Sequence, residues 1–253
     1  RVAVFESKPD WVINAGAYTA VDRAETEPEL AQAVNGLAPR AFAEALAQTG
    51  GRLLQVSTDF VFNGRQGHPY EPAQPRDPLG VYGTTKAAGE QAIAEVLGVE
   101  REGRAALLRT SWMYGPVGAN FLLTMLRLHR QKAVAAEPLR VVADQVGCPT
   151  STAGLAAACW RLVERQLGGV MHWSDAGAAS WYDFAVAIGE LAEMSGHLEH
   201  AATVLPISSA DYPTPAQRPA YSLLDCTSSR ELLDLKPTHW RQALQEVIAD
   251  VGT

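Results

Sequence analysis

The hydrophobic residues of the chain fall into two patterns that alternate along its first half. Short, mostly apolar runs at residues 11–15, 53–57 and 105–110 are typical of strands buried on both faces of a parallel sheet. Between them, residues 28–48 and about 79–96 carry apolar side chains at helical spacing. This order of strand, helix and strand predicts an α/β fold with right-handed parallel crossovers.

The chain opens at Arg1 in a stretch that resembles the tail of a helix, just before the strand 11–15. The second half of the chain shows the same two patterns in shorter elements. The predicted helices cover residues 120–131, 152–167 and a stretch from about Arg241, and the predicted strands cover 139–142, 170–173 and 203–207. A further helix begins after Ser180, because serine is a good N-cap and Asp183 completes a box-like pattern with it.

Two Pro-rich segments interrupt these patterns. Residues 63–80 contain four prolines and three glycines, which exclude regular structure. A loop of that length is more often functional than a simple connector, so we expect a binding loop or lid there. A second Pro-rich loop covers residues 209–222. We expect the shape of these two loops to set substrate specificity.

Composition narrows the class of protein further. The 253 residues are 47% hydrophobic and 19% charged, as in ordinary globular proteins. A formal net charge of −7 argues against general affinity for nucleic acid or for an anionic membrane, and no apolar run is long enough to span a bilayer. Cys148, Cys159 and Cys226 have no metal-ligand spacing and are typical of reduced thiols in a cytoplasmic protein. His197 and His200 are better explained as the solvated end of a helix than as zinc ligands.

The strongest candidate chemistry lies at the end of the predicted strand 53–57. Ser57, Thr58 and Asp59 follow that strand, and Tyr82 and Lys86 lie four residues apart on one face of the next predicted helix. Ligands of open α/β sheets bind beyond the carboxyl ends of the strands. A hydroxyl, a phenol and an ammonium there could move a proton next to a carbonyl, and we expect Lys86 to lower the pKa of Tyr82 from about 10 toward neutrality.

Two neighbouring strand ends remain open to more than one interpretation. Ala15, Gly16 and Ala17 could let a flat ligand lie against the backbone, or could serve only a tight turn. Trp112 and Tyr114 could stack on a base or a sugar, or could cap the core.

Six phrases, taken in order across nearly the whole chain, resemble the extended short-chain dehydrogenase/reductase superfamily and, within it, the dTDP-4-dehydrorhamnose reductase family. They are VINAGAYTAVD (residues 12–22), STDFVFNG (57–64), VYGTTK (81–86), RTSWMYG (109–115), DQVGCPT (144–150) and RPAYSLLD (218–225). The resemblance implies a Rossmann-type parallel sheet with a smaller α+β substrate-binding lobe. On this basis we expect residues 1–114 and 152–175 to form the NADP-binding domain, and residues 115–151 and 176–253 to form the lobe.

The same resemblance implies a reaction and a set of roles. The reaction is reduction of the 4-keto group of dTDP-4-dehydro-L-rhamnose to dTDP-L-rhamnose, with NADPH, or alternatively NADH, as the hydride donor. Its product would serve the synthesis of cell-surface polysaccharide such as O-antigen. Tyr82 would protonate the carbonyl oxygen, Lys86 would bind the nicotinamide ribose, and Thr58 would orient the substrate. The residues implied at the cofactor are Ala15, Gly16, Ala17, Ser57, Tyr82 and Lys86. Those implied at the substrate are Thr19, Val21, Thr58, Phe60, Trp112, Asn120 and Arg218, the last as a partner of the diphosphate.

The chain departs from the family pattern at two places. The Gly-rich phosphate loop of the family would precede residue 1 by roughly one βαβ unit, so we expect this stretch alone to bind NADPH poorly. Some family members form magnesium-bridged dimers through acidic side chains after the Pro-Thr turn. Residues 151–155 of this chain carry no carboxylate, so we expect neither Mg²⁺ nor a metal-bridged dimer, but a monomer or a weak homodimer.

Other functions remain open. A sugar-nucleotide epimerase or dehydratase of the same superfamily is one, although dehydratases generally place Asp-Glu after the Thr, and here Asp59-Phe60 follows Thr58. A non-catalytic cofactor-binding subunit, similar to the regulatory subunit of methionine adenosyltransferase, is another. A serine hydrolase is disfavoured because no G-x-S-x-G elbow is present.

Overall fold

The computed structural model describes residues 1–252 and is built on a four-stranded parallel sheet in the order β1-β2-β3-β8. Its strands are β1 (Trp11–Asn14), β2 (Arg52–Thr58), β3 (Ala105–Thr110) and β8 (Gly169–His172). The predicted α/β class and parallel pairing are confirmed. Because all four strands run in one direction, their carboxyl ends lie at one edge of the sheet, which is where the candidate chemistry falls.

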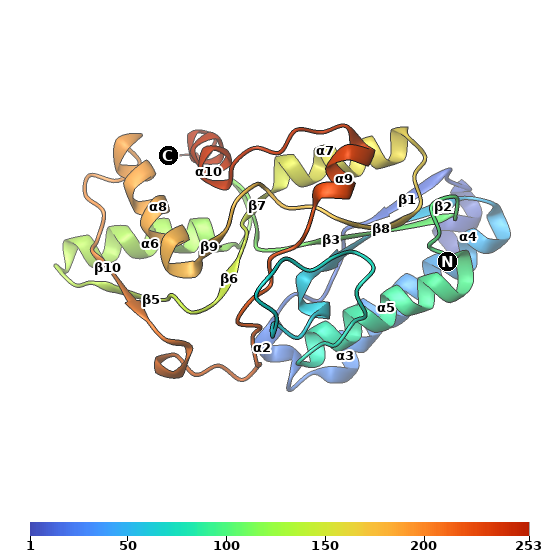
Figure 1. Ribbon diagram of the computed structural model, residues 1–253, viewed down its shortest axis with the longest axis horizontal. Coiled ribbons are helices and arrows are strands. Elements are labelled where there is room, and N and C mark those ends of the chain that lie inside the picture. Colours follow the sequence, from blue (N-terminus) through green and yellow to red (C-terminus); the bar gives the residue numbers. More distant parts are fainter. Residues whose placement is uncertain (253) are drawn as a thin grey trace.

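Helices cover both faces of this sheet (Figure 1). One face is covered by α4 (Ala38–Thr49) and α5 (Val81–Leu97), with α1 (Val2–Ser7) beside α4, and the other by α7 (Thr152–Glu164) and α9 (Thr227–Leu233). Successive residues of a strand point to opposite faces, so Leu53 packs under α4 and α5 while Leu54 packs under α7 and α9. This double burial explains the continuous apolar runs in the sequence.

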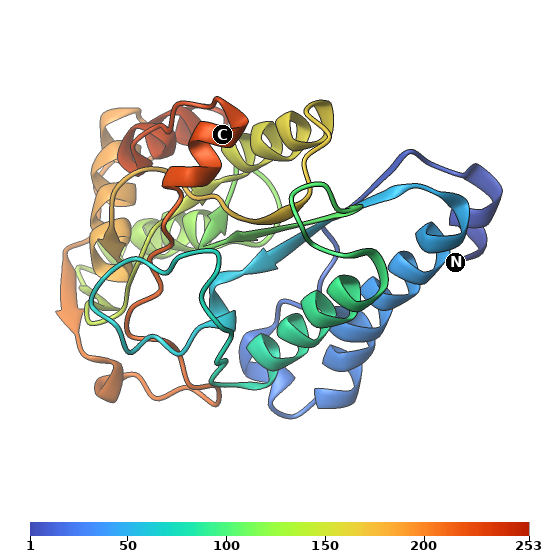
Figure 2. The same cartoon turned by 45° about the vertical axis from the view of Figure 1, so that its right-hand side comes forward.

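A second core lies beyond one end of the sheet (Figure 2). It is formed by α6 (Phe121–Val134), α8 (Trp181–Met194) and α10 (Trp240–Ala249), together with a two-stranded parallel ladder of β5 (Leu139–Val142) and β10 (Val204–Ile207). Phe184 lies at its centre, stacked on Phe121 and edge-on to Tyr114. Two short strand pairs join this region to the sheet: β4 (Met113–Tyr114) with β7 (Thr150–Ser151), and β6 (Val146–Gly147) with β9 (Ala179–Ser180).

Most predicted elements agree with the structure to within a few residues, and the capping box of Ser180 and Asp183 is confirmed. The prediction of one continuous α-helix over residues 28–48 is wrong. The segment consists of α3 (Pro28–Gln32) and α4, joined by a π-helical turn, Ala33–Leu37. Pro39 has no N–H to donate to the Asn35 carbonyl, and that carbonyl instead lies against Gly89 of α5. The short helices α2 (Val21–Ala24) and α9 were not predicted from the sequence.

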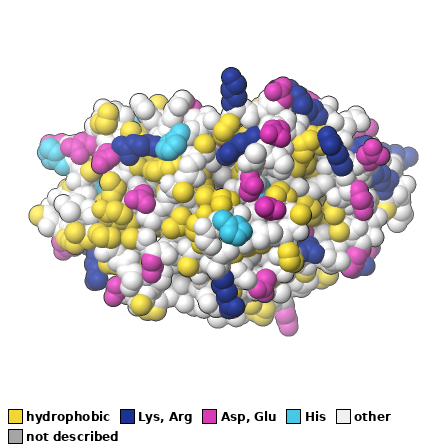
Figure 3. Space-filling model, viewed as in Figure 1, with side chains coloured by type: hydrophobic (Ala, Val, Ile, Leu, Met, Phe, Trp, Pro, Cys, Tyr) yellow, Lys and Arg dark blue, Asp and Glu magenta, His cyan; other side chains and the backbone are white. Residues whose placement is uncertain are grey.

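The face of the molecule drawn in Figure 3 carries charges of both signs. Lys and Arg side chains are interspersed with Asp and Glu across the face in Figure 3, with hydrophobic side chains between them. Among residues 1–252, no helix has the length and apolar character needed to cross a membrane.

Candidate active site

The end of β2 places a buried hydroxyl at the carboxyl edge of the sheet. Thr58, 5% exposed, caps the 3₁₀ turn Asp59–Val61: its Oγ1 accepts a hydrogen bond from Phe60 N at 3.2 Å and donates to Asp59 Oδ1 at 3.1 Å. The turn ends the strand by satisfying its last polar groups locally. Thr58 is therefore held in place by both the sheet and the turn.

The first turn of α5 lies directly against this turn because of Gly83. A Cβ at Gly83 would be 2.2 Å from the Phe60 carbonyl oxygen, so only glycine permits this approach. Tyr82 then packs edge-on against the Phe60 ring, with centroids 5.5 Å apart, and its phenol faces Thr58. The N-terminus of the helix is fixed by Glu25, whose carboxylate accepts the Val81 N–H at 2.9 Å.

The Tyr82 phenol is a neutral proton donor in this arrangement. Burial raises the pKa of Tyr82 to about 12, the Asp59 charge adds to the shift, and the Thr58 hydroxyl opposes it. The prediction that Lys86 lowers the pKa of Tyr82 is wrong for this arrangement, because the Lys86 ammonium donates instead to the Val56 carbonyl at 2.8 Å. Desolvation of the phenol therefore outweighs any attraction from the cation.

Lys86 is itself unusual, since it is only 4% exposed. Burial lowers the pKa of its ammonium to about 8, while the charge of Glu90, one helical turn further along α5, acts to raise it. The side chain is still mostly charged at neutral pH. A buried cation beside a phenol and a hydroxyl can stabilise negative charge that develops between them.

Asp59 is the acidic member of this group. Its carboxyl is 2% exposed, and Oδ2 has no hydrogen-bond partner among the described residues. Burial raises the pKa of Asp59 to about 6, although hydroxyls of Ser222 and Thr58 oppose the shift. This oxygen has less than 1 Å² of accessible surface, so it faces the interior beside the turn and not a ligand in this arrangement.

Ser57 points away from this edge. Its Oγ donates to Glu90 Oε1 at 2.5 Å, below the strand, so its side chain is not available to a ligand on the Thr58 side. If Ser57 contacts the cofactor, as the sequence predicts, only its backbone is free to do so.

The end of β1 presents small residues to solvent. Ala15 and Gly16 are exposed and Ala17 is half-buried. Asn14 accepts the Gly16 N–H at 3.2 Å and donates to the Gln55 side chain at 2.7 Å, which orders the turn without covering it. This surface fits a flat ligand lying across the carboxyl edge of the sheet. Thr19 is exposed and Val21 half-buried, just beyond it.

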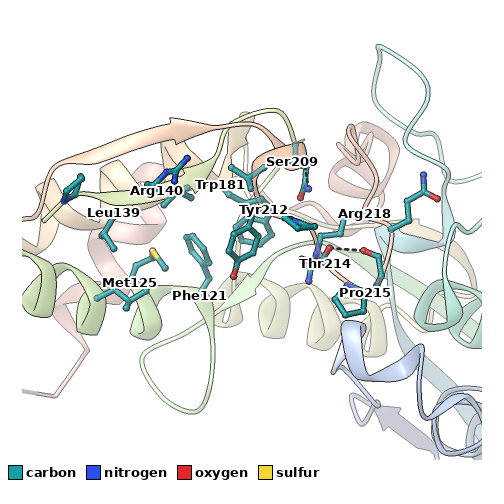
Figure 4. Close-up of a pocket in the computed structure, with 18 of the residues that line it drawn as sticks. Phe121, Met125, Leu139, Arg140, Trp181, Ser209, Tyr212, Thr214, Pro215 and Arg218 are labelled. Atoms are coloured by element: carbon teal, nitrogen blue, oxygen red, sulfur yellow. Dashed lines mark hydrogen bonds between the residues drawn. The ribbon is translucent and has the colours of Figure 1, made fainter.

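A cavity of about 980 Å³ lies beside the second core (Figure 4). Its aromatic side chains are Phe121, Trp181 and Tyr212, which come from α6, α8 and the loop 209–222. Cationic side chains also line it: Lys132, Arg140 and Arg218. Aromatic walls with a few cations suit a ligand that carries both a planar ring and anionic groups.

Two predicted substrate residues lie near this cavity but do not line it. Trp112 is stacked on Trp181 with ring centroids 3.7 Å apart, and it adopts a positive φ of 46°. Asn120 is the N-cap of α6. Its side-chain oxygen accepts the Leu123 N–H, and its side-chain NH₂ donates to the backbone carbonyls of Gly115 and Val117. Asn120 therefore acts in this structure by ordering the helix that carries Phe121.

Arg218 lines the cavity and is held by Asp22, a residue from the N-terminal part of the chain. Its Nη2 lies 2.8 Å from Asp22 Oδ2, and Asp22 Oδ1 accepts the Ala216 N–H at 3.3 Å. Asp22 thus ties the 209–222 loop to α2, next to the end of β1. The sequence reasoning missed Asp22, Trp181 and Tyr212; Asp22 stands inside one of the recognised phrases, so the motif was a usable signal for it.

Comparison with known proteins places these features in a family. The family described as RmlD substrate binding domain matches residues 2–253. A dTDP-4-dehydrorhamnose reductase of Aggregatibacter actinomycetemcomitans is 38% identical over 96% of this chain and 81% of its own length. The spore coat polysaccharide biosynthesis protein SpsK of Bacillus subtilis is 39% identical over 96% of this chain and 80% of its own length.

Solved structures agree. The dTDP-4-dehydrorhamnose reductase of Bacillus anthracis, in complex with NADP, superposes with a TM-score of 0.88 at 34% identity. The match covers 98% of this chain and 83% of that one. The Rossmann-type architecture expected from the sequence is therefore confirmed.

Proposed function

Because the chain belongs to the RmlD substrate binding domain family, we propose that it is an NADPH-dependent oxidoreductase that reduces the 4-keto group of dTDP-4-dehydro-L-rhamnose to dTDP-L-rhamnose. The observation that carries the proposal is the neutral Tyr82 phenol beside Thr58 and the buried Lys86 ammonium, at the carboxyl edge of a parallel sheet. The relatives named for this reaction and the NADP complex of a structural neighbour support it.

Tyr82, Thr58 and Lys86 have different roles in the proposed reaction. NADPH, when bound, supplies the hydride. As the hydride arrives, the carbonyl oxygen becomes an alkoxide, and Tyr82, whose phenol is neutral because burial raises its pKa to about 12, gives its proton to that oxygen. Thr58 holds that oxygen within reach of Tyr82, and Lys86 stabilises the negative charge left on the phenolate.

We place the cofactor along the exposed backbone of Ala15, Gly16 and Ala17, with the Lys86 ammonium at its ribose hydroxyls. The open end of β1 and the position of Lys86 at the same sheet edge support this placement. Residues 1–114 and 152–175 then form the cofactor domain, and residues 115–151 and 176–253 the substrate lobe, except that α9 within the second range packs on the main sheet.

We place the nucleotide part of the substrate in the cavity beside the second core. The aromatic rings of Trp181 and Tyr212 suit a base, and Arg140 and Arg218 suit the diphosphate. Trp112 backs the wall through its stack on Trp181, and Phe60, Thr19 and Val21 lie toward the sugar.

We expect the product to serve the synthesis of surface polysaccharide, since one relative is named for spore coat polysaccharide biosynthesis. The cysteines, which are buried and unpaired in the described chain, suit a reducing compartment, so we place the reaction in the cytoplasm. NADPH is the expected cofactor, with NADH as the alternative.

The test is NADPH oxidation by the full-length protein with dTDP-4-dehydro-L-rhamnose, for the parent, Tyr82→Phe and Tyr182→Phe. Tyr182 lies on α8 and provides the matched control for removing a phenolic hydroxyl. We expect parent turnover, a loss of about 10²-fold or more in Tyr82→Phe, and little change in Tyr182→Phe. Tight NADPH binding without turnover by the parent would contradict the reductase and favour a cofactor-binding regulatory subunit.

A further inference from the structure

A buried ion pair lies directly beneath the candidate active site. Glu90 of α5 is 1% exposed and Arg109 of β3 is 3% exposed. Arg109 Nη2 lies 2.7 Å from Glu90 Oε2, and Arg109 Nε lies 3.0 Å from Glu90 Oε1, so the guanidinium grips both carboxylate oxygens. This fork geometry fixes the direction of the carboxylate as well as its charge.

The Glu90 carboxylate connects β2 with α5, because Glu90 belongs to α5 and accepts a hydrogen bond from β2. Ser57, the residue before Thr58, donates its hydroxyl to Glu90 Oε1 at 2.5 Å. Glu90 lies one turn after Lys86 and two turns after Tyr82 on the same helix. A single side chain therefore links the end of β2 to the helix that carries the other two catalytic groups.

The same pair also holds the Pro-rich loop of residues 63–80. Arg109 Nη1 donates to the Pro72 carbonyl at 3.1 Å, and Arg76 lies 3.5 Å from Glu90 Oε2. His172, on β8, completes the anchor. Burial and the Arg109 charge lower the pKa of His172 to about 3, so the ring is neutral. Its Nδ1–H donates to the Tyr70 carbonyl at 3.0 Å, and Nε2 faces Arg109 at 3.4 Å.

We propose that Glu90, gripped by Arg109, is a positioning residue that sets Thr58, Tyr82 and Lys86 in their reactive arrangement and anchors residues 63–80 to the same point. This inference rests on the proposed reductase function. In this proposal Glu90 and Arg109, which are 1% and 3% exposed, act without touching substrate or cofactor. They act through Ser57 and through the helix that Lys86 and Glu90 share.

A positioning role predicts effects that a purely structural role does not. Glu90, on its own helix, is the charged group that acts on Lys86, and Arg109 on β3 and Arg76 in the loop pair in turn with Glu90. Asp59, after β2, acts on the neighbouring Tyr82. Glu90 is the anion that raises the pKa of Lys86, so Glu90→Gln removes that anion and the pKa of Lys86 falls further below about 8. Ser57→Ala keeps every charge and removes only the tie to β2.

The experiment compares the full-length parent with Glu90→Gln, Ser57→Ala and the control Glu190→Gln, at a temperature where each is folded. Glu190 also pairs with an arginine, Arg241, but on the exposed face of α8. The measurements are kcat and KM for the ketosugar, the pH profile of kcat/KM, and the pKa of Lys86 by NMR titration without cofactor.

We expect kcat of Glu90→Gln to fall by about 10- to 100-fold with KM little changed, because misplacement of reacting groups acts on the transition state. The alkaline limb of its pH profile and the NMR pKa of Lys86 move to lower pH. Ser57→Ala loses about 3- to 10-fold in kcat, as expected for one hydrogen bond, with an unchanged pH profile. Glu190→Gln matches the parent.

Parent-like kcat and pH profile in both Glu90→Gln and Ser57→Ala, with only a lower melting temperature, would show a structural role and overturn the proposal. If Glu90→Gln does not fold, Ser57→Ala decides: an unchanged kcat overturns the proposal, and a fall in kcat with constant KM supports it. A parent that does not turn over any ketosugar overturns the proposed function, and the positioning role falls with it.

Discussion

The sheet edge to which we assign the chemistry and the cavity in which we place the nucleotide are built in opposite ways. Thr58 and Lys86 are about 5% exposed or less and are fixed by a strand, a helix and buried hydrogen bonds. The cavity is closed on one side by residues 209–218, where Tyr212 is 61% exposed. Its ties to the rest of the molecule are exposed polar contacts: the Asp22–Arg218 pair, whose side chains are 38% and 27% exposed, and the hydrogen bonds that Ser209 donates to the Asp144 carboxylate.

This difference in exposure suits the functions that we propose for the two regions. Proton transfer needs atoms held in place to within fractions of an ångström, so the groups involved lie on regular elements. Binding a large substrate requires a wall that can admit it, and loops with few buried contacts supply the low-stability segments that such opening needs. The two ion pairs show the contrast: Glu90–Arg109 is desolvated, and Asp22–Arg218 is partly hydrated.

The largest expected effect comes from breaking each pair in turn. Arg109→Met leaves Glu90 buried without its main partner, and we expect a loss of about 3–5 kcal/mol in the free energy of unfolding. Asp22→Asn, at the cavity, should cost less than about 1 kcal/mol, because water already shares that pair. Urea denaturation of both variants checks this. Equal losses would mean that the two regions do not differ in rigidity as described.

A smaller effect, dependent on pH, should come from Asp59. Its pKa is raised to about 6 in the folded protein from an ordinary value near 4, so the stability it contributes is present below about pH 4 and is lost as pH rises through about 6. Asp59→Asn should therefore be more stable than the parent by about 1–3 kcal/mol at pH ~8, with the gain shrinking as pH falls toward ~5.

Asp175 provides the control for that measurement. Burial also raises its pKa to about 6, but Asp175 accepts the Ser151 N–H at 3.0 Å, and its other oxygen lies 3.3 Å from Ser151 Oγ. Asp175→Asn turns one acceptor oxygen into a donor facing those groups, so we expect a smaller gain or a loss. Urea denaturation across this pH range compares the two variants, and a parent more stable than Asp59→Asn at pH ~8 would contradict the account.

The sheet and its helices could be predicted from the sequence because double burial leaves unmistakable apolar runs. β3 and β5 have the predicted bounds, and β2 differs by one residue at each end. The π-helical turn Ala33–Leu37 could not be predicted, since it depends on how close the Asn35 carbonyl comes to Gly89, a contact between two helices. The short helix α2 carries too few residues for its periodicity to be visible.

The candidate site likewise has a part that could be predicted from the sequence and a part that could not. Thr58, Tyr82 and Lys86 are brought to one edge because strand order and helical spacing, both visible in the sequence, place them there. The cavity combines α6, β5, α8 and a loop far along the chain, so Trp181 and Tyr212 carried no local signal. The pKa of Tyr82 was mispredicted because burial, which the sequence does not give, outweighs the neighbouring cation.

We propose that the sheet edge performs the chemistry and that the cavity recognises the nucleotide part of the substrate. The most direct measurement is kcat and KM of Thr58→Val and Trp181→Ala with dTDP-4-dehydro-L-rhamnose and NADPH. We expect Thr58→Val to lose about 10-fold or more in kcat with KM little changed, and Trp181→Ala to raise KM by about 10-fold with kcat little changed. A Thr58→Val variant with parent-like kcat, or a Trp181→Ala variant that loses kcat alone, would contradict the account.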